Sequence, residues 1–317
     1  MLKLRIALLT FALFLPLQSQ ADFIKYKNYL IPIQSNCTQF DNDLPRVLYF
    51  DDVGVLPEDP NGVQELPIVA GLHNYKVNIV AMGTNSIHNG SYELVKDVMS
   101  RSVHSDIPLL DRNEIADRII AEANCVPAGE LLHVALGGEY DQLADALDAD
   151  PSIASKIKAY GLLTSNGEDE NEASYNVAKG HLGSNLVEID FHNQETDEFR
   201  SRTQFYSNDP GVRHVFHAFY PRGSITESSL NNILFNQINT KLSGITDIRG
   251  ESITSTNDAY LVTTKNWGFS EFHVNASSDL YLRIADFLTV AAVFLPLRDV
   301  YSTSGMHNLI EEATSRF

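Results

Sequence analysis

The sequence has 317 residues, of which 44% are hydrophobic, and it carries 41 acidic side chains against 23 lysines and arginines. The resulting net charge of −18 argues against nucleic-acid polymers as partners, because phosphate backbones are bound by clusters of Lys and Arg. A chain of this length forms one large domain or two smaller ones. Since no repeat and no linker rich in Pro, Gly or Ser marks a boundary, we expect residues 22–317 to form a single domain.

The first 21 residues have the features of a secretory signal peptide. Lys3 and Arg5 precede an apolar run at residues 6–17, and Ala21 ends a short polar stretch that suits cleavage. The apolar run is too short to span a membrane comfortably, and no cysteine at the cut offers a lipid anchor. We therefore expect a periplasmic or secreted protein with no membrane anchor. The sequence does not indicate its oligomeric state.

The sequence contains two cysteines, Cys37 and Cys125. An exported protein reaches an oxidising compartment, which favours a disulfide between them. Closing so long a loop would stabilise the fold by about 4 kcal/mol if the effect is one of chain entropy. Two separate thiols are the alternative.

Predicted strands and helices alternate along the first half of the chain. Short apolar runs predict strands, and apolar residues at helical spacing predict helices. The expected strands are residues 47–50, 78–82, 107–109, 131–136 and 159–163. The expected helices are residues 63–72, 92–102, 114–124, 141–149 and 151–158. Such alternation is typical of an α/β fold with a mostly parallel sheet flanked by helices.

The remaining segments have weaker patterns. Residues 22–43 have little periodicity and are expected to form an arm, and residues 164–174 are expected to form a polar loop. In the second half, strands are predicted at residues 186–191, 213–219 and 260–263, and helices at residues 229–242 and 279–294.

A dense group of acids follows the first predicted strand. Asp51 and Asp52 end that strand, and Glu58 and Asp59 follow a few residues later. In open α/β sheets ligands bind just past the carboxyl ends of the strands. Carboxylates at this density suit a hard cation such as Ca²⁺ or Mg²⁺. The alternative is an acidic surface loop in which Asp51 or Asp59 caps the next helix.

The order of these segments resembles the inosine-uridine-preferring nucleoside hydrolases. That family opens with a strand and a D-x-D-x-G-x-D-D loop, and the comparable stretch here is FDDVGVLPED, residues 50–59. Phe50 replaces the family's first acid, and two extra residues separate Gly54 from the acidic pair. The resemblance implies that Asp52 is the general base and also a metal ligand, and that Asp59 is a calcium ligand.

Three later segments extend the resemblance. The strand ending in GTN is similar to the family's G-N, whose Asn contacts ribose, and this points to Asn85. Residues 135–144, ALGGEYDQLA, resemble A-L-G-P-L-T-N-I-A, where Thr gives a main-chain carbonyl to calcium, so Tyr140 would do so here. Residues 171–176, NEASYN, resemble the E-F-N ribose loop, with Ser174 at the position of the Glu.

The remaining implied ligands come from the same comparison. Asn176 ends the ribose-loop segment, and Asn166 precedes it as a further candidate for contact with the sugar. Asp286 in DFLTVA matches the acid of H-D-P-L-A-V, which makes it the last calcium ligand. Each of these residues has an ordinary alternative, since Asn is common in turns and Asp at the start of helices.

The resemblance implies a nucleoside-hydrolase-like fold and calcium-dependent hydrolysis of the N-glycosidic bonds of ribonucleosides or related ribosides. Such cleavage passes through an oxocarbenium-like sugar, and it needs an activated water, held hydroxyls and a protonated leaving group. The family's leaving-group His corresponds to Ala285 here. His88, His273 and Tyr206 are possible substitutes, although nothing in the sequence positions them.

Two other functions stay open. The missing His, the substitution at Phe50 and the inserted residues favour a catalytically degenerate protein that binds a sugar or nucleoside on the same fold. An altered ribose loop would also suit an enzyme that cleaves other glycan bonds. In each case the expected partner is a small-molecule nucleoside or sugar.

Overall fold

The computed structural model describes part of the chain. The described residues are 23–26, 29–32, 38–53, 61–87, 90–162, 171–192, 203–207, 216–218, 241, 287–294 and 303–317. The chain divides into two compact units, Met1–Cys37 and Thr38–Phe317. In the first unit, strands β1 (Phe23–Tyr26) and β2 (Tyr29–Pro32) pair as an antiparallel hairpin, which the sequence did not predict. The predicted signal peptide lies outside the described residues.

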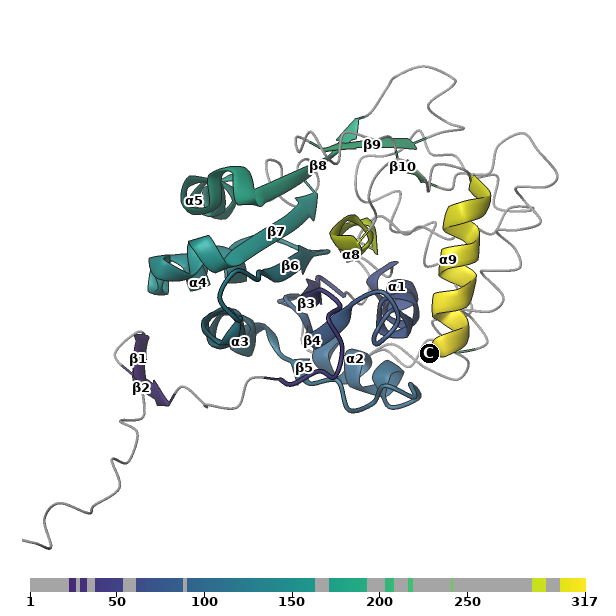
Figure 1. The fold of residues 1–317 in the computed structure, drawn as a ribbon, viewed down its shortest axis with the longest axis horizontal. Coiled ribbons are helices and arrows are strands. Elements are labelled where there is room, and N and C mark those ends of the chain that lie inside the picture. Colours follow the sequence, from purple (N-terminus) through teal and green to yellow (C-terminus); the bar gives the residue numbers. More distant parts are fainter. Residues whose placement is uncertain are drawn as a thin grey trace, which may run out of the picture. The chain divides into compact units, whose positions relative to one another are not determined.

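The second unit is built on one large sheet (Figure 1). Its described strands follow the order β10-β9-β8-β7-β6-β3-β4-β5. The strands are β3 (Arg46–Asp51), β4 (Asn78–Thr84), β5 (Leu109–Leu110), β6 (Leu132–Leu136), β7 (Ile157–Leu162), β8 (Leu186–His192), β9 (Thr203–Ser207) and β10 (Phe216–Ala218). All pairs from β5 to β8 are parallel, whereas β9 and β10 join antiparallel. The predicted mostly parallel α/β sheet is confirmed.

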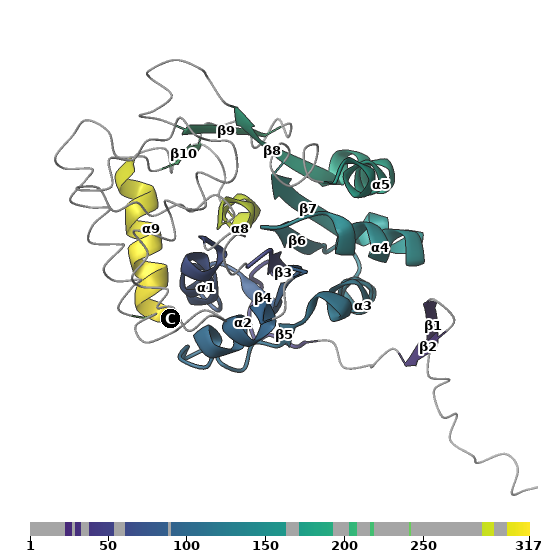
Figure 2. The same ribbon diagram turned by 180° about the vertical axis from the view of Figure 1, so that it is seen from behind.

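Helices cover both faces of this sheet, as Figures 1 and 2 show from opposite sides. One face carries α1 (Asn61–Gly71), α2 (Ser91–Met99) and α8 (Phe287–Phe294), with α9 (Thr303–Arg316) packed against α1. The other face carries α3 (Arg112–Cys125), α4 (Asp141–Ala149) and α5 (Glu172–Leu182), with the short 3-10 helices η1 (Pro151–Lys156) and η3 (Gly183–Asn185). No helix within the described residues is long and apolar enough to cross a membrane.

The direction in which successive strands are added to the sheet reverses between β3 and β6, and we call this place the reversal point. From β3 the chain adds β4 and β5 on one side, and it then crosses to the other side to add β6, β7 and β8. Right-handed crossovers explain why α1 and α2 cover one face and α3, α4 and α5 cover the other. In doubly wound sheets, ligands bind outside the carboxyl ends of the two strands that flank such a reversal. The fold therefore directs attention to the ends of β3 and β6.

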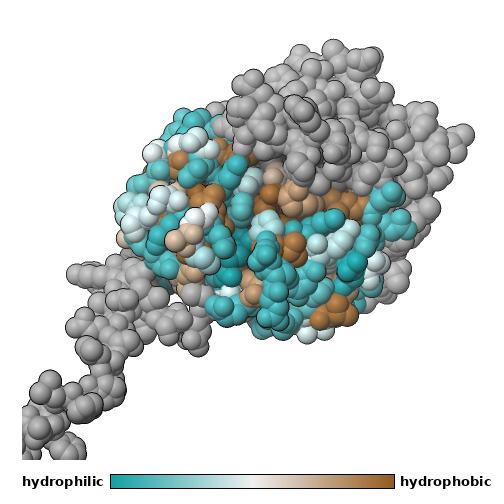
Figure 3. Space-filling view, viewed as in Figure 1, coloured by the Kyte–Doolittle hydropathy of each residue, from teal (hydrophilic) through white to brown (hydrophobic). Residues whose placement is uncertain are grey.

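Apolar side chains pack on both faces of the central strands. All seven residues of β4 are buried, as expected for a parallel strand covered by helices on both sides. On the α1 and α8 face the core includes Tyr49, Leu66, Phe287 and Ile310. Each large apolar side chain buried in this way contributes roughly 1.5–3 kcal/mol. Hydrophilic residues cover most of the described surface in Figure 3, with hydrophobic residues in smaller patches between them.

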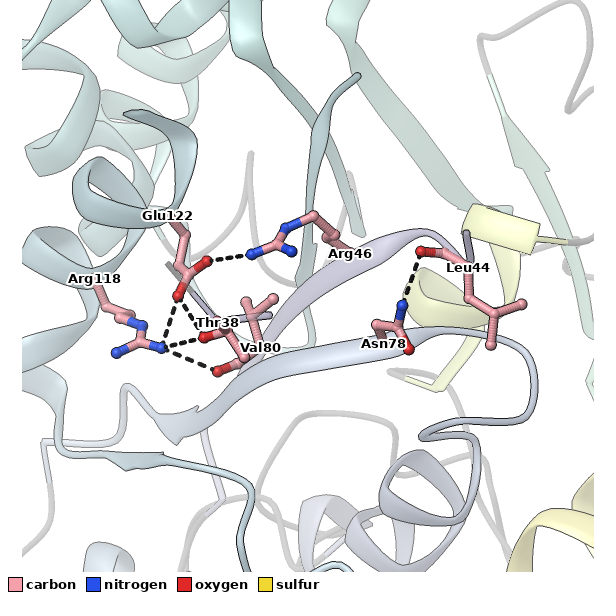
Figure 4. Close-up of polar contacts among 7 residues, drawn as sticks. All are labelled: Thr38, Leu44, Arg46, Asn78, Val80, Arg118 and Glu122. Atoms are coloured by element: carbon pink, nitrogen blue, oxygen red, sulfur yellow. Dashed lines mark hydrogen bonds and ion pairs between the residues drawn. The ribbon is translucent and has the colours of Figure 1, made fainter. Parts of the chain in front are cut away.

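A buried carboxylate fixes the chain where it enters the sheet (Figure 4). Glu122 is 2% exposed and accepts hydrogen bonds from Arg46 at 2.9 Å and from Thr38 at 2.8 Å. Arg118 pairs with the same carboxylate at 2.7 Å and also reaches the Val80 carbonyl oxygen at 3.3 Å. These contacts connect α3 to the first residues of β3 and to β4.

The cysteines agree with an oxidised protein as far as they are described. Cys125, the last residue of α3, is disulfide-bonded. No described cysteine is free. Cys37 is the other cysteine of the sequence, and it lies outside the described residues.

Some expected elements are corrected by the structure. The strand predicted at residues 107–109 is formed by Leu109–Leu110 instead. The predicted polar loop at residues 164–174 ends early, because the Asn171 side chain accepts a hydrogen bond from the Ser174 N–H and caps helix α5 from Glu172 onward. Helix α5, strand β9 and helix α9 were not predicted. The strand predicted at 260–263 and most of the helix predicted at 229–242 lie outside the described residues.

Candidate functional site

Two acids end strand β3, and the structure separates their environments. Asp51 is fully buried, and the Tyr49 hydroxyl donates a hydrogen bond to its Oδ2 at 2.6 Å. Tyr49 and Asp51 are two residues apart on the strand, so they point to the same face, the one covered by α1 and α8. Asp52 follows the strand and is only half-buried. Of the two acids, Asp52 is the more exposed.

Asn85 follows strand β4 and joins three strand ends. It is 1% exposed, and its N–H donates to the Asp51 carbonyl oxygen at 3.0 Å. Its side-chain Nδ2 donates to the Glu139 carbonyl oxygen, also at 3.0 Å. Its Oδ1 is buried and has no hydrogen-bond partner among the described residues. One hydrogen bond thus orients the Asn85 side chain, and its acceptor atom Oδ1 lies beside the reversal point without a partner among the described residues.

The lack of a side chain at Gly138 allows the ends of β3, β4 and β6 to approach one another closely. A Cβ atom at Gly138 would meet Asn85 Oδ1 first, and it would lie 2.7 Å from the Asp52 main-chain nitrogen and 2.8 Å from Asn85 Nδ2. Both distances are far shorter than a normal carbon contact, so only glycine fits without displacing its neighbours. The neighbouring Gly137 N–H donates to the Phe50 carbonyl oxygen at 2.8 Å. The structure therefore brings the predicted residues Asp52 and Asn85 together at the ends of β3, β4 and β6.

Tyr140 lies at the start of helix α4. Its carbonyl oxygen accepts the Ala144 N–H at 2.9 Å, which is an ordinary bond of a first helical turn. A carbonyl oxygen has a second lone pair, so this bond is compatible with the predicted coordination of a metal. The Tyr140 side chain is buried against Gly161 with its hydroxyl 3.4 Å from the Leu162 carbonyl oxygen, and burial raises the pKa of that hydroxyl. The metal role of Tyr140 stays a prediction.

Asn176 lies on helix α5 and is exposed. The preceding Tyr175 is buried, and its hydroxyl donates to Glu188 on β8 while accepting from Lys179 at 2.7 Å. Burial, followed by the hydrogen bond to Glu188, raises the pKa of Tyr175 to about 12. Tyr175 thus anchors α5 to the sheet, and Asn176 is carried on its outer side. Its contact with a sugar stays a prediction.

The other predicted site residues cannot be placed. Asn166, Asp59 and Asp286 lie outside the described residues, as do His88 and His273. Tyr206 lies on β9, but its side chain is not described.

A polar network that the sequence did not predict runs along the same edge of the sheet. Arg112, the first residue of α3, donates to the Asn85 carbonyl oxygen and to Asp141 Oδ2, the latter at 2.8 Å. Asp141, the first residue of α4, also accepts from Asn171 and from Ser174 Oγ, at 2.7 Å for the hydroxyl. The one local signal is the D-x-x-E capping box of Asp111, which places the start of α3 just after β5.

A second buried acid, Glu65 on α1, was also missed. Glu65 is fully buried, and its carboxylate accepts the N–H of Phe287, the first residue of α8. This bond satisfies one of the free N–H groups at the start of that helix. Phe287 directly follows Asp286 in the sequence, so Glu65 fixes the helix start beside a predicted metal ligand.

The described residues offer oxygen ligands but not a complete metal site. No group of three or more His, Cys, Asp or Glu side chains close enough to hold a metal occurs among them. Near the reversal point they supply the Asp52 carboxylate and Asn85 Oδ1, a buried oxygen without a hydrogen-bond partner in the described part of the chain. Such hard oxygen atoms suit Ca²⁺ rather than a softer metal. The donor chemistry therefore fits the expected cation.

Comparisons with known proteins give little direct guidance. No protein-family model and no curated protein matches the chain. Among solved structures it matches a plant nucleoside hydrolase with a TM-score of 0.46 and 12% sequence identity, over 80% of each chain. At this TM-score and identity, the match assigns neither a family nor an activity to the chain.

Proposed function

We propose that this protein hydrolyses the N-glycosidic bonds of ribonucleosides or related ribosides in a calcium-dependent reaction. The observation that carries the proposal is the position of Asp52. It is a half-buried acid at the carboxyl end of β3, beside Asn85 and Gly138, at the reversal point of a doubly wound sheet. This is the residue that the motif resemblance makes the general base.

The chain's own residues would share the work as follows. Asp52 would take a proton from the attacking water, since it is the more exposed acid of the pair at the strand end. Asn85 would hold a sugar hydroxyl, as the motif resemblance implies. Asn166 and Asn176 would hold further hydroxyls. Hydrogen bonds of this kind strengthen as the sugar becomes oxocarbenium-like.

Calcium would be held by Asp52, Asp59, Asp286 and the Tyr140 carbonyl oxygen. When bound, it would align a water and the sugar hydroxyls and make that water easier to deprotonate. Glu65 would assist indirectly, because its bond to the Phe287 N–H holds the helix start that follows Asp286.

A binding protein without catalysis is the second candidate. It is favoured by Ala285, which stands where the resemblance predicts the leaving-group acid. General acid catalysis typically contributes about 10²–10⁴-fold, so its loss weakens cleavage of poor leaving groups most. Under either function the partner is a small-molecule nucleoside or sugar, and the signal-like residues 1–21 make us propose a periplasmic or secreted location.

The test is product release from a panel of substrates. The mature chain would be incubated with purine and pyrimidine ribonucleosides, nitrophenyl riboside and oligosaccharides, with calcium or with chelator, and free sugar would be measured. Calcium-dependent release of ribose supports the proposed activity. Binding of ribose without release from any substrate supports the second candidate, and release from oligosaccharides alone contradicts both.

A further inference from the structure

Four consecutive connections at the carboxyl edge of the sheet are tied together by side chains. Asn85 follows β4, Arg112 follows β5, Asp141 follows β6, and Asn171 and Ser174 follow β7. Single hydrogen bonds in this network join residues that are up to 33 positions apart in the sequence. Because each connection carries a member of the network, a displacement of one member is transmitted to the others.

Arg112 joins the residues after β4 to the start of α4. Its guanidinium donates to the Asn85 main-chain carbonyl through one nitrogen and to Asp141 through another. The Arg112 and Asp141 side chains are 25% and 21% exposed, so the ion pair is largely shielded from water. Charge-assisted hydrogen bonds with such shielding are among the stronger ones in proteins. Arg112 thereby fixes the main chain that carries the Asn85 side chain.

Asp141 joins Arg112 to the start of α5. Its Oδ1 accepts from Asn171 Nδ2 and from Ser174 Oγ, while its Oδ2 accepts from Arg112. Asn171 and Ser174 are also joined to each other by the 3.2 Å bond that caps α5. One carboxylate thus sets both the start of α5 and the position of Arg112.

We propose that Arg112 and Asp141 are positioning residues of the site, which hold Asn85 and the start of α5 in one arrangement. The inference rests on the proposed function, because these are the two segments that are expected to hold the sugar. Neither Arg112 nor Asp141 is assigned a sugar contact; they act through Asn85 and through α5. Losing either one uncouples the two segments and weakens sugar binding.

The experiment compares Arg112→Met, Arg112→Lys and Asp141→Asn with the control Arg316→Met. Arg316 also forms an ion pair, with Glu312, but this pair is exposed and lies on α9, which packs against α1. Backbone amide exchange would be followed at residues 84–87 and 171–176 in the full mature chain. Arg112→Met and Asp141→Asn should raise exchange about tenfold in both segments. Arg316→Met should raise it in neither.

Ribose affinity supplies the second readout, measured by calorimetry with calcium present. Arg112→Met should raise the Kd for ribose about tenfold or more, Arg112→Lys should recover part of the loss, and Arg316→Met should leave the Kd unchanged. An exchange increase confined to the substituted helix, or an unchanged Kd in Arg112→Met, overturns the positioning role. If the wild-type chain binds neither ribose nor a nucleoside, the proposed function fails, and the exchange comparison alone decides whether the two segments are coupled.

Discussion

The side-chain amide of Asn85 donates a hydrogen bond to the main-chain carbonyl of Glu139 across 3.0 Å, although the two residues are 54 positions apart in the sequence. Asn85 follows β4 and Glu139 follows β6, and β3 lies between these strands in the sheet. The bond therefore spans the end of β3, where Asp52 is found. This arrangement makes the reversal point a place where an acid, an amide and a glycine meet.

Gly138→Ala should disrupt the close packing of Asp52, Asn85 and Gly138. The added Cβ would lie 2.7 Å from the Asp52 main-chain nitrogen, so that strand end and the Asn85 side chain must move. Overpacking of this kind costs about 1–3 kcal/mol, and a displacement of about 1 Å at a reacting group can lower the rate 10²-fold. Urea unfolding and riboside turnover would measure the two effects.

Gly180→Ala on helix α5 is the matched control. A Cβ at Gly180 meets nothing within 4 Å. Since Ala is favoured over Gly in a helix, this variant should be more stable by up to about 1 kcal/mol and fully active. Equal turnover in Gly138→Ala and Gly180→Ala would contradict the account of the site.

Local pattern was sufficient for the parallel core of the fold. The runs at residues 47–50, 78–82 and 141–149 correspond to β3, β4 and α4, because buried strands are continuously apolar and an amphipathic helix repeats its apolar residues. Helix α5 was not predicted, because its polar first turn resembles a loop. Its cap depends on Asn171, whose role appears only once Ser174 is folded back on it.

The proximity of candidate-site residues was predictable only where a strand end and a motif coincide. Asp52 and Asn85 each follow an apolar run, and parallel strands bring their carboxyl ends to one edge. The pair Arg112 and Asp141 gave no such signal, since a contact between residues 29 positions apart leaves no local pattern. The same applies to Glu65 and Phe287, which are 222 positions apart.

Calcium should stabilise the chain. After treatment with chelator, titration to 100 times the Kd should add about 2.7 kcal/mol, which corresponds to a rise in Tm of about 5 °C for a chain of this size. Asp59→Ala and Asp286→Ala should abolish the rise, and Asp97→Ala, an exposed acid on α2, should retain it. A Tm that does not respond to calcium, or the same response in all variants, would rule out these ligands.

Glu122→Gln should destabilise the protein strongly. The carboxylate is 2% exposed and balances both Arg46 and Arg118, so its loss leaves two partly buried cations without their partner. Removing one member of such a buried group costs about 3–5 kcal/mol. Glu312→Gln is the control, because the Glu312–Arg316 pair is exposed, so that water screens its attraction and its loss should change stability little. Similar midpoints of urea unfolding for both variants would show that the buried group contributes little.

His133 should make stability fall in mild acid. Burial, with a smaller effect of Lys158, lowers the pKa of His133 from 6.5 to about 4. Between these values the unfolded chain binds more protons than the folded one, so stability is complete above pH 6.5 and is lost as the pH falls toward 4. His133 is half-buried, with the Tyr160 hydroxyl 3.0 Å from its ring nitrogen, and the shift in its pKa corresponds to a loss of roughly 3 kcal/mol at most.

His133→Gln should reduce this pH dependence, measured as the unfolding free energy between pH 4 and pH 7. A remainder should persist, because burial also lowers the pKa of His73 and of His104. The interpretation is wrong if His133→Gln and the wild type lose stability in parallel.

The most direct test of the central claim is the rate of ribose release by Asp52→Asn, measured beside the wild type in saturating calcium. Asn keeps the size of the side chain but cannot accept the proton of the attacking water, so turnover should fall by about 10²–10⁴-fold. The melting curve in chelator should stay close to that of the wild type, since Asp52 is only half-buried. Asp97→Asn should release ribose at the wild-type rate. Wild-type turnover in Asp52→Asn would show that the chemistry takes place elsewhere in the protein.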